Sequence, residues 1–415
     1  MDSVEFAPPV GEVPSKEGSD RLRLAAVALA GVFAFLDLYA SQPLLPLLKH
    51  LYHASAGETG LTVSATTFGV AISAPFAGMI ADRLGRKPVI VACLLGLAVP
   101  TLLASTATSL IALIIWRFVA GIFMPGIIAG TLAYITEEWS TAGAAGAVAA
   151  YVTGSVFGGF IGRLLSGLLA ERICWQASFI VLGLVTLLGT GLIARWLPNS
   201  RYFIPQLSWR GGLRNMVEHL HNPLLIATCA VGFSVLFSLV ATFTFITFHL
   251  AAAPYRLGPA GQGAIFMVYL LGIFVTPASG KWIAKLGRRK SVTMAALVAS
   301  CGVLLTLSGP LWLIVAGLAI CSSGEFVCQA AASSFIGIAV DRARSAASGL
   351  YVTVYYIGGS VGAAAPGVVW DHFRWPGCVL LIVCVQLVSA GVAFIFWKER
   401  TPSLEVELVP DTLQY

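Results

Sequence analysis

Charged residues are scarce in this sequence. Asp, Glu, Lys and Arg make up 11% of the 415 residues, whereas hydrophobic residues make up 58%. Soluble domains carry about 25% charged residues, so this chain has too few charges to cover a surface that faces water. The net charge of +6 is dispersed along the chain and does not form the clustered basic footprint of a nucleic-acid-binding protein. The composition predicts a protein embedded in a lipid bilayer, with no nucleic-acid partner.

Motifs that mark common energy sources and metal sites are missing as well. The single Gly-Lys pair, Gly280-Lys281, is followed by Trp282, so the sequence has no phosphate-binding P-loop and ATP is not expected as a direct energy source. The eight cysteines include no C-x-x-C pair, and seven of them lie within apolar runs, where cysteine acts as a small buried hydrophobe. We therefore expect no enzyme, no cofactor and no metal site.

Long apolar runs dominate what is present. A membrane-spanning helix needs about 20 mostly apolar residues, and twelve such runs follow one another along the chain. They cover residues 24–47, 60–81, 88–107, 109–133, 143–170, 175–197, 223–252, 262–283, 289–309, 311–336, 345–370 and 375–397. The predicted fold is an all-α membrane protein with twelve transmembrane helices.

The connection near the middle of the chain is longer than the others. Residues 198–222 contain three arginines, two prolines and two adjacent glycines, which is typical of a linker between two halves. The expected organisation is a tail at 1–23, a six-helix bundle at 24–197, the linker at 198–222, a second bundle at 223–397 and a tail at 398–415. The first 23 residues lack a short apolar core with a cleavage site, so a cleaved signal peptide is not expected.

Lysine and arginine are concentrated on one set of alternating loops. With the N-terminus placed inside, 17 of the 25 basic residues lie in the tails and cytoplasmic loops, and 4 lie in the outer loops. Cytoplasmic loops of membrane proteins carry an excess of these residues. The distribution predicts that both termini are cytoplasmic, which requires an even number of crossings.

Two stretches of the sequence repeat at a spacing of about 200 residues. Residues 151–175 and 351–375 share eight identical positions, and residues 78–87 align with residues 280–289. The second apolar run thus corresponds to the eighth, and the fifth to the eleventh. This pattern predicts two pseudo-symmetric six-helix bundles related by an axis along the membrane normal, with a substrate site between them near the midplane.

The loop after the second apolar run carries the most specific motif. It reads Gly78-Met-Ile-Ala-Asp82-Arg83-Leu-Gly85-Arg86-Lys87. This spacing resembles the signature of the major facilitator superfamily, a glycine and three residues followed by D-R-x-G-R-[RK]. The resemblance implies that the loop is a conformational gate.

The charges of this loop need partners at the helix ends. Arg86 can pair with a carboxylate such as Glu137 or Glu138, which end the fourth run. The second copy of the loop keeps Arg288 but has Ala284 where the first copy has Asp82. The proposed gate therefore consists of Gly78, Asp82, Arg83, Gly85, Arg86, Glu137 and Arg288.

Three other runs resemble helices of the same superfamily. Arg117, followed four residues later by Gly121, is similar to a motif of the fourth helix. The fifth run, from Gly158 to Gly167, is similar to the motif of drug:proton antiporters, with Arg163 in place of a proline. The first run, from Asp37 to Pro46, is similar to the first helix of efflux permeases.

Ionisable groups within a bilayer are costly and are usually functional. The resemblance implies that the first, fourth, seventh and tenth helices line one cavity, so Asp37, Arg117 and Glu325 are expected around one site. The proposed cavity residues for substrate and proton coupling are Asp37, Gln42, Arg117, Arg163 and Glu325. Phe35, Thr244, Thr247 and His249 are further candidates for the lining.

The expected function is secondary active transport, with proton-coupled efflux of drugs or small metabolites by a monomer in a bacterial inner membrane. Two alternatives stay open at this point. One is a symporter or uniporter that takes up a small polar metabolite, and the other is a sensor that does not transport. The complete loop at 78–87 and the charges within the runs argue against the sensor.

Overall fold

The structure is a computed structural model that describes residues 17–200, 210–340 and 342–397, and no β-strand occurs among them. The first half contains α1 (Glu17–Leu38), η1 (Gln42–Leu44), α2 (Leu45–Leu51), α3 (Ala56–Leu84), α4 (Arg86–Ala104), α5 (Leu110–Glu138), α6 (Thr141–Arg172) and α7 (Trp175–Trp196). The second half contains α9 (Pro223–Ala251), α10 (Pro259–Ile265), η2 (Phe266–Leu271), α11 (Gly272–Leu286), α12 (Arg288–Leu305), α13 (Leu311–Ala339) and α14 (Arg344–Phe396). A short helix, α8 (Arg210–His219), precedes the second half.

The helices account for twelve crossings of a membrane. Ten described helical segments are long and apolar enough to span it. α12 adds one, because three basic residues fill its first turn and apolar residues follow. α14 has 53 residues and is non-helical at Arg374; its length of about 80 Å exceeds the hydrocarbon core of about 30 Å, so it crosses twice. The predicted all-α fold with twelve transmembrane helices is confirmed.

Hydrogen-bonding side chains set where several helices begin. Ser55 accepts a hydrogen bond from the backbone of Glu58, whose side chain accepts one from the Ser55 backbone, and this capping box starts α3. Ser109 and Ser140 cap α5 and α6, and Asn222 caps α9. Each cap satisfies backbone N–H groups that the helix itself leaves free.

The first membrane crossing is interrupted where the sequence places two prolines. α1 ends at Leu38, and the chain continues through η1 into α2, with Pro43 and Pro46 at the starts of these two segments. Proline has no N–H to donate within a helix. The interruption turns the carbonyl groups of Asp37 and Leu38 toward other partners, which is important for the site described below.

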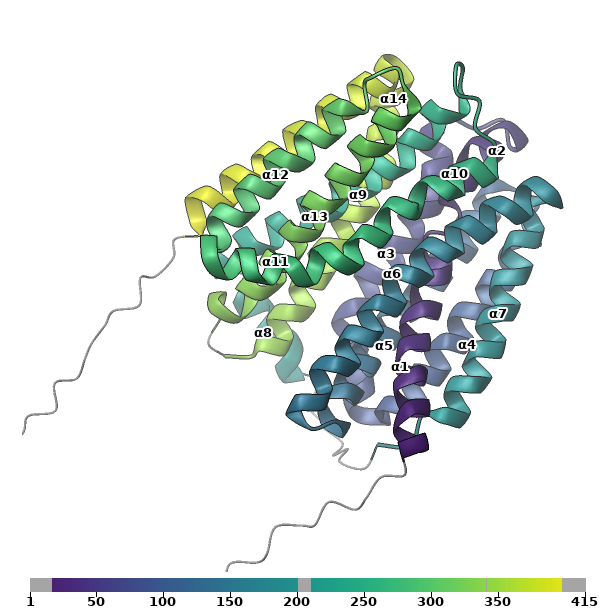
Figure 1. Ribbon diagram of the computed structural model, residues 1–415. Coiled ribbons are helices and arrows are strands. Elements are labelled where there is room, and N and C mark those ends of the chain that lie inside the picture. Colours follow the sequence, from purple (N-terminus) through teal and green to yellow (C-terminus); the bar gives the residue numbers. More distant parts are fainter. Residues whose placement is uncertain (1–16, 201–209, 341, 398–415) are drawn as a thin grey trace, which may run out of the picture.

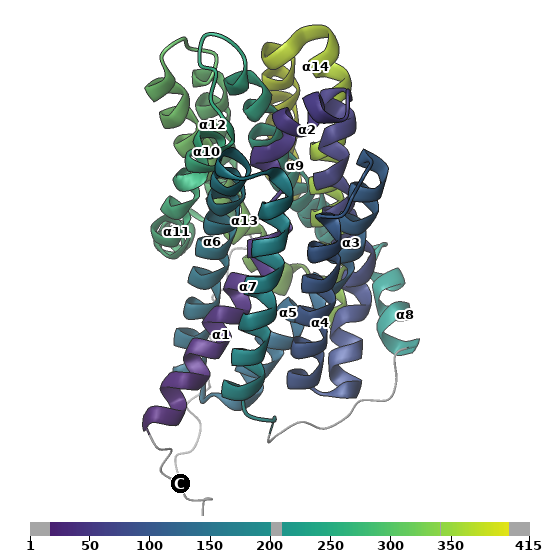
Figure 2. The same cartoon turned by 90° about the vertical axis from the view of Figure 1, so that its right-hand side faces the viewer.

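The two halves form bundles that lie side by side (Figure 1), and Figure 2 shows them from the side. α3 and α6 of the first bundle contact α14 and α10 of the second. We name the two ends of the molecule by residues: the Ser55 end, where α3 begins, and the Gly85 end, where α3 meets α4.

Backbones of the two bundles approach closely at the Ser55 end. A Cβ atom added to Gly57 would lie 3.3 Å from the Cα of Gly367, and one added to Gly60 would overlap the carbonyl of Ala363. Ser64 and Ser360 are hydrogen-bonded at 2.8 Å, and Glu171 accepts a hydrogen bond from the backbone of Ala260 at 2.9 Å. These contacts hold the bundles together at this end.

The equivalent helices are not packed in this way at the Gly85 end. A Cβ atom added to Gly78 or to Gly280 would meet no atom within 4 Å. These two glycines occupy the same position in the two copies of the repeated loop. The residues that turn the chain after them are also alike, since Gly85 has a φ angle of 95° and Gly287 of 81°, values that favour glycine.

Candidate functional site

A cavity of about 330 Å³ lies between the two bundles. Its lining includes Phe35, Tyr39 and Gln42 from the first crossing, Arg163 from α6, Leu236 and Val240 from α9, Tyr269 from η2, Phe326 and Gln329 from α13, and Tyr355 and Tyr356 from α14. Most of these side chains are apolar or aromatic. Both bundles contribute, so relative movement of the bundles would change the shape of the cavity.

Arg163 is the charged residue of the cavity lining. Its side chain is 4% exposed. Nε donates a hydrogen bond to Oε1 of Gln42 at 2.7 Å, and Nη1 donates one to the carbonyl of Gly159 at 2.6 Å. The ring centroids of Tyr39, Phe266 and Tyr269 lie 4.5, 4.7 and 5.1 Å from its guanidinium carbon. The structure thus brings Gln42 and Arg163, two of the predicted residues, together.

Gln42 links this arginine to the second bundle. Its Nε2 donates a hydrogen bond to Oγ1 of Thr244 at 3.1 Å. The chain of hydrogen bonds therefore runs from Arg163 on α6 through Gln42 to Thr244 on α9. A side chain that is bonded to both bundles is well placed to respond when either one moves.

Asp37 and Arg117 lie within the first bundle and do not line the cavity. Both side chains are fully buried. Nη2 of Arg117 donates hydrogen bonds to the carbonyls of Asp37 and Leu38, each at 2.6 Å, where the interruption of α1 leaves those carbonyls available. Oδ2 of Asp37 accepts a hydrogen bond from Thr186 at 2.9 Å, whereas its Oδ1 has no hydrogen-bond partner in the part of the chain that the structure describes.

Glu325 occupies a separate position in the second bundle. It is 2% exposed and accepts a hydrogen bond from Nε2 of Gln386 at 2.8 Å, and Oε1 of Gln386 accepts one from Ser300 at 2.8 Å. The structure therefore does not bring Asp37, Arg117 and Glu325 around one site. For Asp37 the reason is helical geometry: Phe35 and Tyr39 face the cavity, and a residue two positions away lies on roughly the opposite face of a helix.

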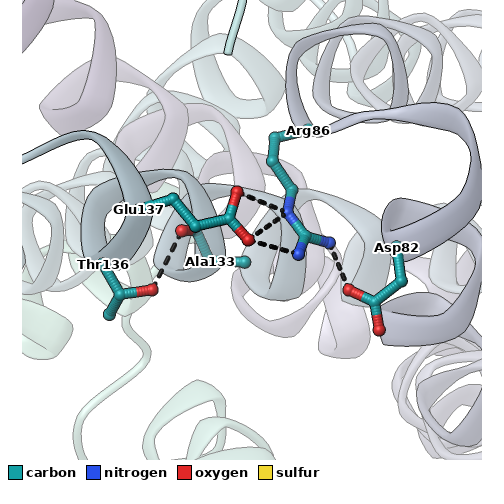
Figure 3. Close-up of polar contacts among 5 residues, drawn as sticks. All are labelled: Asp82, Arg86, Ala133, Thr136 and Glu137. Atoms are coloured by element: carbon teal, nitrogen blue, oxygen red, sulfur yellow. Dashed lines mark hydrogen bonds and ion pairs between the residues drawn. The ribbon is translucent and has the colours of Figure 1, made fainter. Parts of the chain in front are cut away.

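The predicted loop at 78–87 is instead the end of α3, the turn at Gly85 and the start of α4, and it holds an ion-pair network (Figure 3). Nη1 of Arg86 contacts Asp82 at 2.5 Å, while Nε and Nη2 contact the carboxylate of Glu137, the latter at 2.5 Å. The network joins the α3–α4 turn to the end of α5. Arg83 is exposed at the end of α3, and Glu138 pairs with Arg23 at 3.5 Å.

The second copy of the loop keeps the arginine but has no acidic partner at the position of Asp82, where it has Ala284. Nε of Arg288 donates a hydrogen bond to Ser334 of α13 at 3.0 Å. Arg288 therefore joins α12 to α13, as Arg86 joins α4 to α5. The two arginines form a natural pair for comparison, because only one of them has carboxylate partners among the described residues.

Replacing Arg86 with alanine is expected to lower the transport rate by roughly 10-fold, because a charge-assisted hydrogen bond contributes about 1.5–3 kcal/mol and these carboxylates are partly exposed. Asp82→Asn should lower the rate less, and Arg288→Ala should leave it nearly unchanged. Initial rates per correctly inserted molecule in proteoliposomes would measure this. Equal losses for the two arginine variants would contradict a special role of the first loop.

Several contacts could not be anticipated from the sequence. No sequence motif includes the partners of Asp37, Glu325 and Arg163, which are Thr186, Gln386, Phe266 and Tyr269. A hydroxyl or amide within an apolar run is only a weak signal of a polar partner. His249, a candidate for the lining, instead stacks on Trp375 with ring centroids 6.0 Å apart.

The string Gly358–Gly362 matches the G-x-S-x-G pattern of serine hydrolases, but it lies within helix α14, where Ser360 bonds to Ser64.

Two six-helix bundles around a shared cavity, with ionisable groups buried in each bundle, define a polytopic membrane transporter. Comparison with known proteins specifies the family. The sequence matches the Major Facilitator Superfamily over residues 27–362 and again over 250–412, so the chain belongs to this family of transporters.

Individual relatives agree with this family. The chain is 31% identical to the inner membrane transport protein YnfM of Escherichia coli over 377 residues, 90% of each chain. It is 32% identical to an uncharacterized transporter of Buchnera aphidicola subsp. Schizaphis graminum, over 87% of this chain and 88% of that one. A solved bacterial homologue of the human lysosomal transporter Spinster superposes with a TM-score of 0.76 at 16% identity, over 92% of this chain and 97% of that one. The relatives are transporters and not enzymes.

Proposed function

We propose that this protein exports drugs or small metabolites across a bacterial inner membrane by alternating access, in exchange for protons. The observation that carries the proposal is the asymmetry between the two ends. Glycine backbones of both bundles meet at the Ser55 end, whereas Gly78 and Gly280 face open space at the Gly85 end. Glycines in the repeated loops are suited to close helix packing, and that packing would form when the Ser55 end opens.

In this proposal residues 24–197 and 223–397 move as two units, connected by the linker at 198–222, in a monomer. Both termini lie in the cytoplasm, so the cavity in this conformation communicates with the cytoplasm and is closed toward the outside. A substrate would enter from the cytoplasm, and the bundles would then rock to close the Gly85 end. The predicted gate residues hold helix ends within their own bundle during this movement, Arg288 in the second bundle and the others in the first.

Proton coupling is proposed for the buried carboxylates. Asp37 and Glu325 are almost inaccessible to solvent, and neither forms an ion pair within 4 Å among the described residues. Retaining an unpaired carboxylate within a bilayer costs about 2.5–3.5 kcal/mol when it is ionised. A group whose environment changes between the two conformations can bind a proton on one side and release it on the other.

A dye-retention assay tests the direction and the energy source. Cells that express the protein are loaded with a panel of cationic, neutral and anionic fluorescent dyes and compared with cells that lack it. Export predicts lower retention of at least one dye in expressing cells, and a protonophore should remove the difference. Higher accumulation in expressing cells would support uptake instead, and a difference that survives the protonophore would contradict proton coupling.

The orientation can be tested with a natural cysteine. Cys174 is exposed in the turn between α6 and α7, at the Ser55 end. A membrane-impermeant maleimide added to intact spheroplasts should label it, and Cys174→Ser should abolish that labelling. A cysteine placed at exposed Lys285, near the Gly85 end, should react only after permeabilisation. The reverse pattern would place both termini outside.

A further inference from the structure

Arg163, a buried cation, faces the cavity and has no counter-ion among the described residues. Arg163 lies within the membrane-spanning part of α6 and is 4% exposed, yet no carboxylate forms an ion pair with it in the described part of the chain. A charge removed from water is strongly unfavourable unless something compensates for it. The protein therefore maintains an uncompensated positive charge where a substrate would bind.

The two buried carboxylates do not supply the missing charge. Oδ2 of Asp37 is bonded to Thr186, on the opposite side of the first crossing from the cavity. The carboxylate of Glu325 is bonded to Gln386. The aromatic rings around Arg163 stabilise its charge through their π faces, but rings and amides leave the net charge at +1.

The hydrogen-bonding capacity of Arg163 is also incomplete. A guanidinium has five N–H donors in a planar fork. The hydrogen bonds to Gln42 and Gly159 use two of them, and the other three have no partner among the described residues. A planar carboxylate accepts two parallel N–H groups from such a fork, and tetrahedral sulfonate or phosphonate oxygens accept them in a similar way.

The rest of the cavity suits an apolar body. Its lining contains no Asp, Glu, Lys or other Arg, and Phe35, Leu236, Val240 and Phe326 contribute apolar surface. A volume of about 330 Å³ is at the lower end of the range of small-molecule sites, roughly 300–1,000 Å³. An organic cation would meet the like charge of Arg163 with no acidic residue in the lining to receive it.

We propose that the substrate is an amphipathic organic anion, with its anionic group on Arg163 and its apolar body against the aromatic side chains. This inference rests on the proposed transport function and names the substrate class of the same cavity. The anion would bind to the N–H groups of Arg163 that Gln42 and Gly159 leave free. Because Gln42 also bonds to Thr244 of the second bundle, the bound anion would lie beside a link between the bundles.

The test uses three anions and two analogues that share a naphthalene ring. The anions are 2-naphthoate, 2-naphthalenesulfonate and 2-naphthylphosphonate, and the analogues are the neutral 2-naphthylmethanol and the cationic 2-naphthylmethylamine. Calorimetric titration of the purified full-length protein should show at least one anion binding more than 10-fold tighter than both analogues. Arg163→Gln should weaken binding of that anion roughly 100-fold, because truncating one member of a buried charge pair leaves the other charge unpaired, and should leave binding of the alcohol unchanged.

Matched variants separate charge from folding. Arg195 is an exposed arginine on α7 outside the cavity, so Arg195→Gln should bind like the wild type. Arg163→Lys should restore part of the affinity if charge is what matters. Anion binding that survives Arg163→Gln, equal or tighter binding of the alcohol or the amine, or binding of none of the three anions would overturn the proposal.

Transport measured on the same compounds distinguishes this inference from the proposed function. If an anion binds through Arg163 but is not moved across proteoliposomes under any imposed gradient, the anion site stands and the transport function fails. If the amine is transported equally by the wild type and by Arg163→Gln, transport stands and the substrate class is wrong.

Discussion

Replacing Gly367 with leucine is expected to lower the transport rate by between 5- and 150-fold while the protein still inserts and folds. An added side chain at this position would overlap the backbone of Gly57 on the other bundle. Forcing extra atoms into a close-packed contact costs about 1–3 kcal/mol. An energy of this size lowers the population of the conformation that is closed at the Ser55 end by about 5- to 150-fold. The bundles would no longer close at the Ser55 end, so one half of the transport cycle would become rare.

Gly391 provides the matched control on the same helix. A Cβ atom there would meet nothing within 4 Å, so Gly391→Leu should transport at the wild-type rate. Closure can also be measured directly by placing a cysteine at Ser360, which is 8% exposed and bonded to Ser64. This cysteine should react with maleimide several-fold faster in the Gly367→Leu background. Unchanged transport and unchanged reactivity in Gly367→Leu would contradict closure through this contact.

Gly78 and Gly280 extend the same reasoning to the other end. Neither position requires glycine for packing in this conformation, although both belong to the repeated loop. A glycine that is unnecessary in one conformation is explained if helices approach it closely in another. The two sets of glycines would then be used alternately, one at the Ser55 end and the other at the Gly85 end.

The sequence was sufficient to predict the membrane fold. Each predicted run coincides with a helical segment, because burial in lipid demands long apolar helices whatever their tertiary contacts. The pairing of Arg86 with a carboxylate at the end of α5 was also predictable, because a charged side chain near a helix end can reach only the few oppositely charged groups at neighbouring helix ends. α14 contains the last two predicted runs, 345–370 and 375–397, in one helical segment. The non-helical backbone angles of Arg374 mark the boundary between them.

The positions of the buried charges were not predictable to the same degree. The interruption of α1 before Pro43 changes which carbonyls are free, and Arg117 binds the backbone of Asp37 instead of its carboxylate. Hydropathy reports whether a run enters the membrane but not which face of the helix a charged residue occupies. The aromatic rings around Arg163 come from two segments far apart in the sequence, Tyr39 between α1 and η1, and Phe266 and Tyr269 in η2, and no motif relates them.

Asp37→Asn is expected to abolish uphill accumulation of substrate while leaving exchange of substrate across the membrane intact. Among the described residues, Oδ1 of Asp37 and the Nε and Nη1 groups of Arg117 have no hydrogen-bond partner, although Arg117 is bonded to the backbone of Asp37 itself. A small rearrangement could form a direct ion pair in one conformation, and its loss in the other would favour a protonated carboxyl. Asparagine has nearly the same shape and cannot carry the proton.

Proteoliposomes with an acidic interior separate coupling from translocation. A difference of one pH unit supplies about 1.4 kcal/mol per proton, which supports a tenfold substrate gradient for one-to-one exchange when valinomycin and equal potassium on both sides hold the membrane potential at zero. Antiport by the wild type should approach that ratio with the interior acidic, and Asp37→Asn should stop at a ratio of one. Asp371→Asn, at an exposed aspartate of α14, is the control and should behave like the wild type. Uphill accumulation by Asp37→Asn with unchanged pH dependence would exclude Asp37 as the carrier, and loss of coupling in Glu325→Gln would then assign the proton to the second bundle.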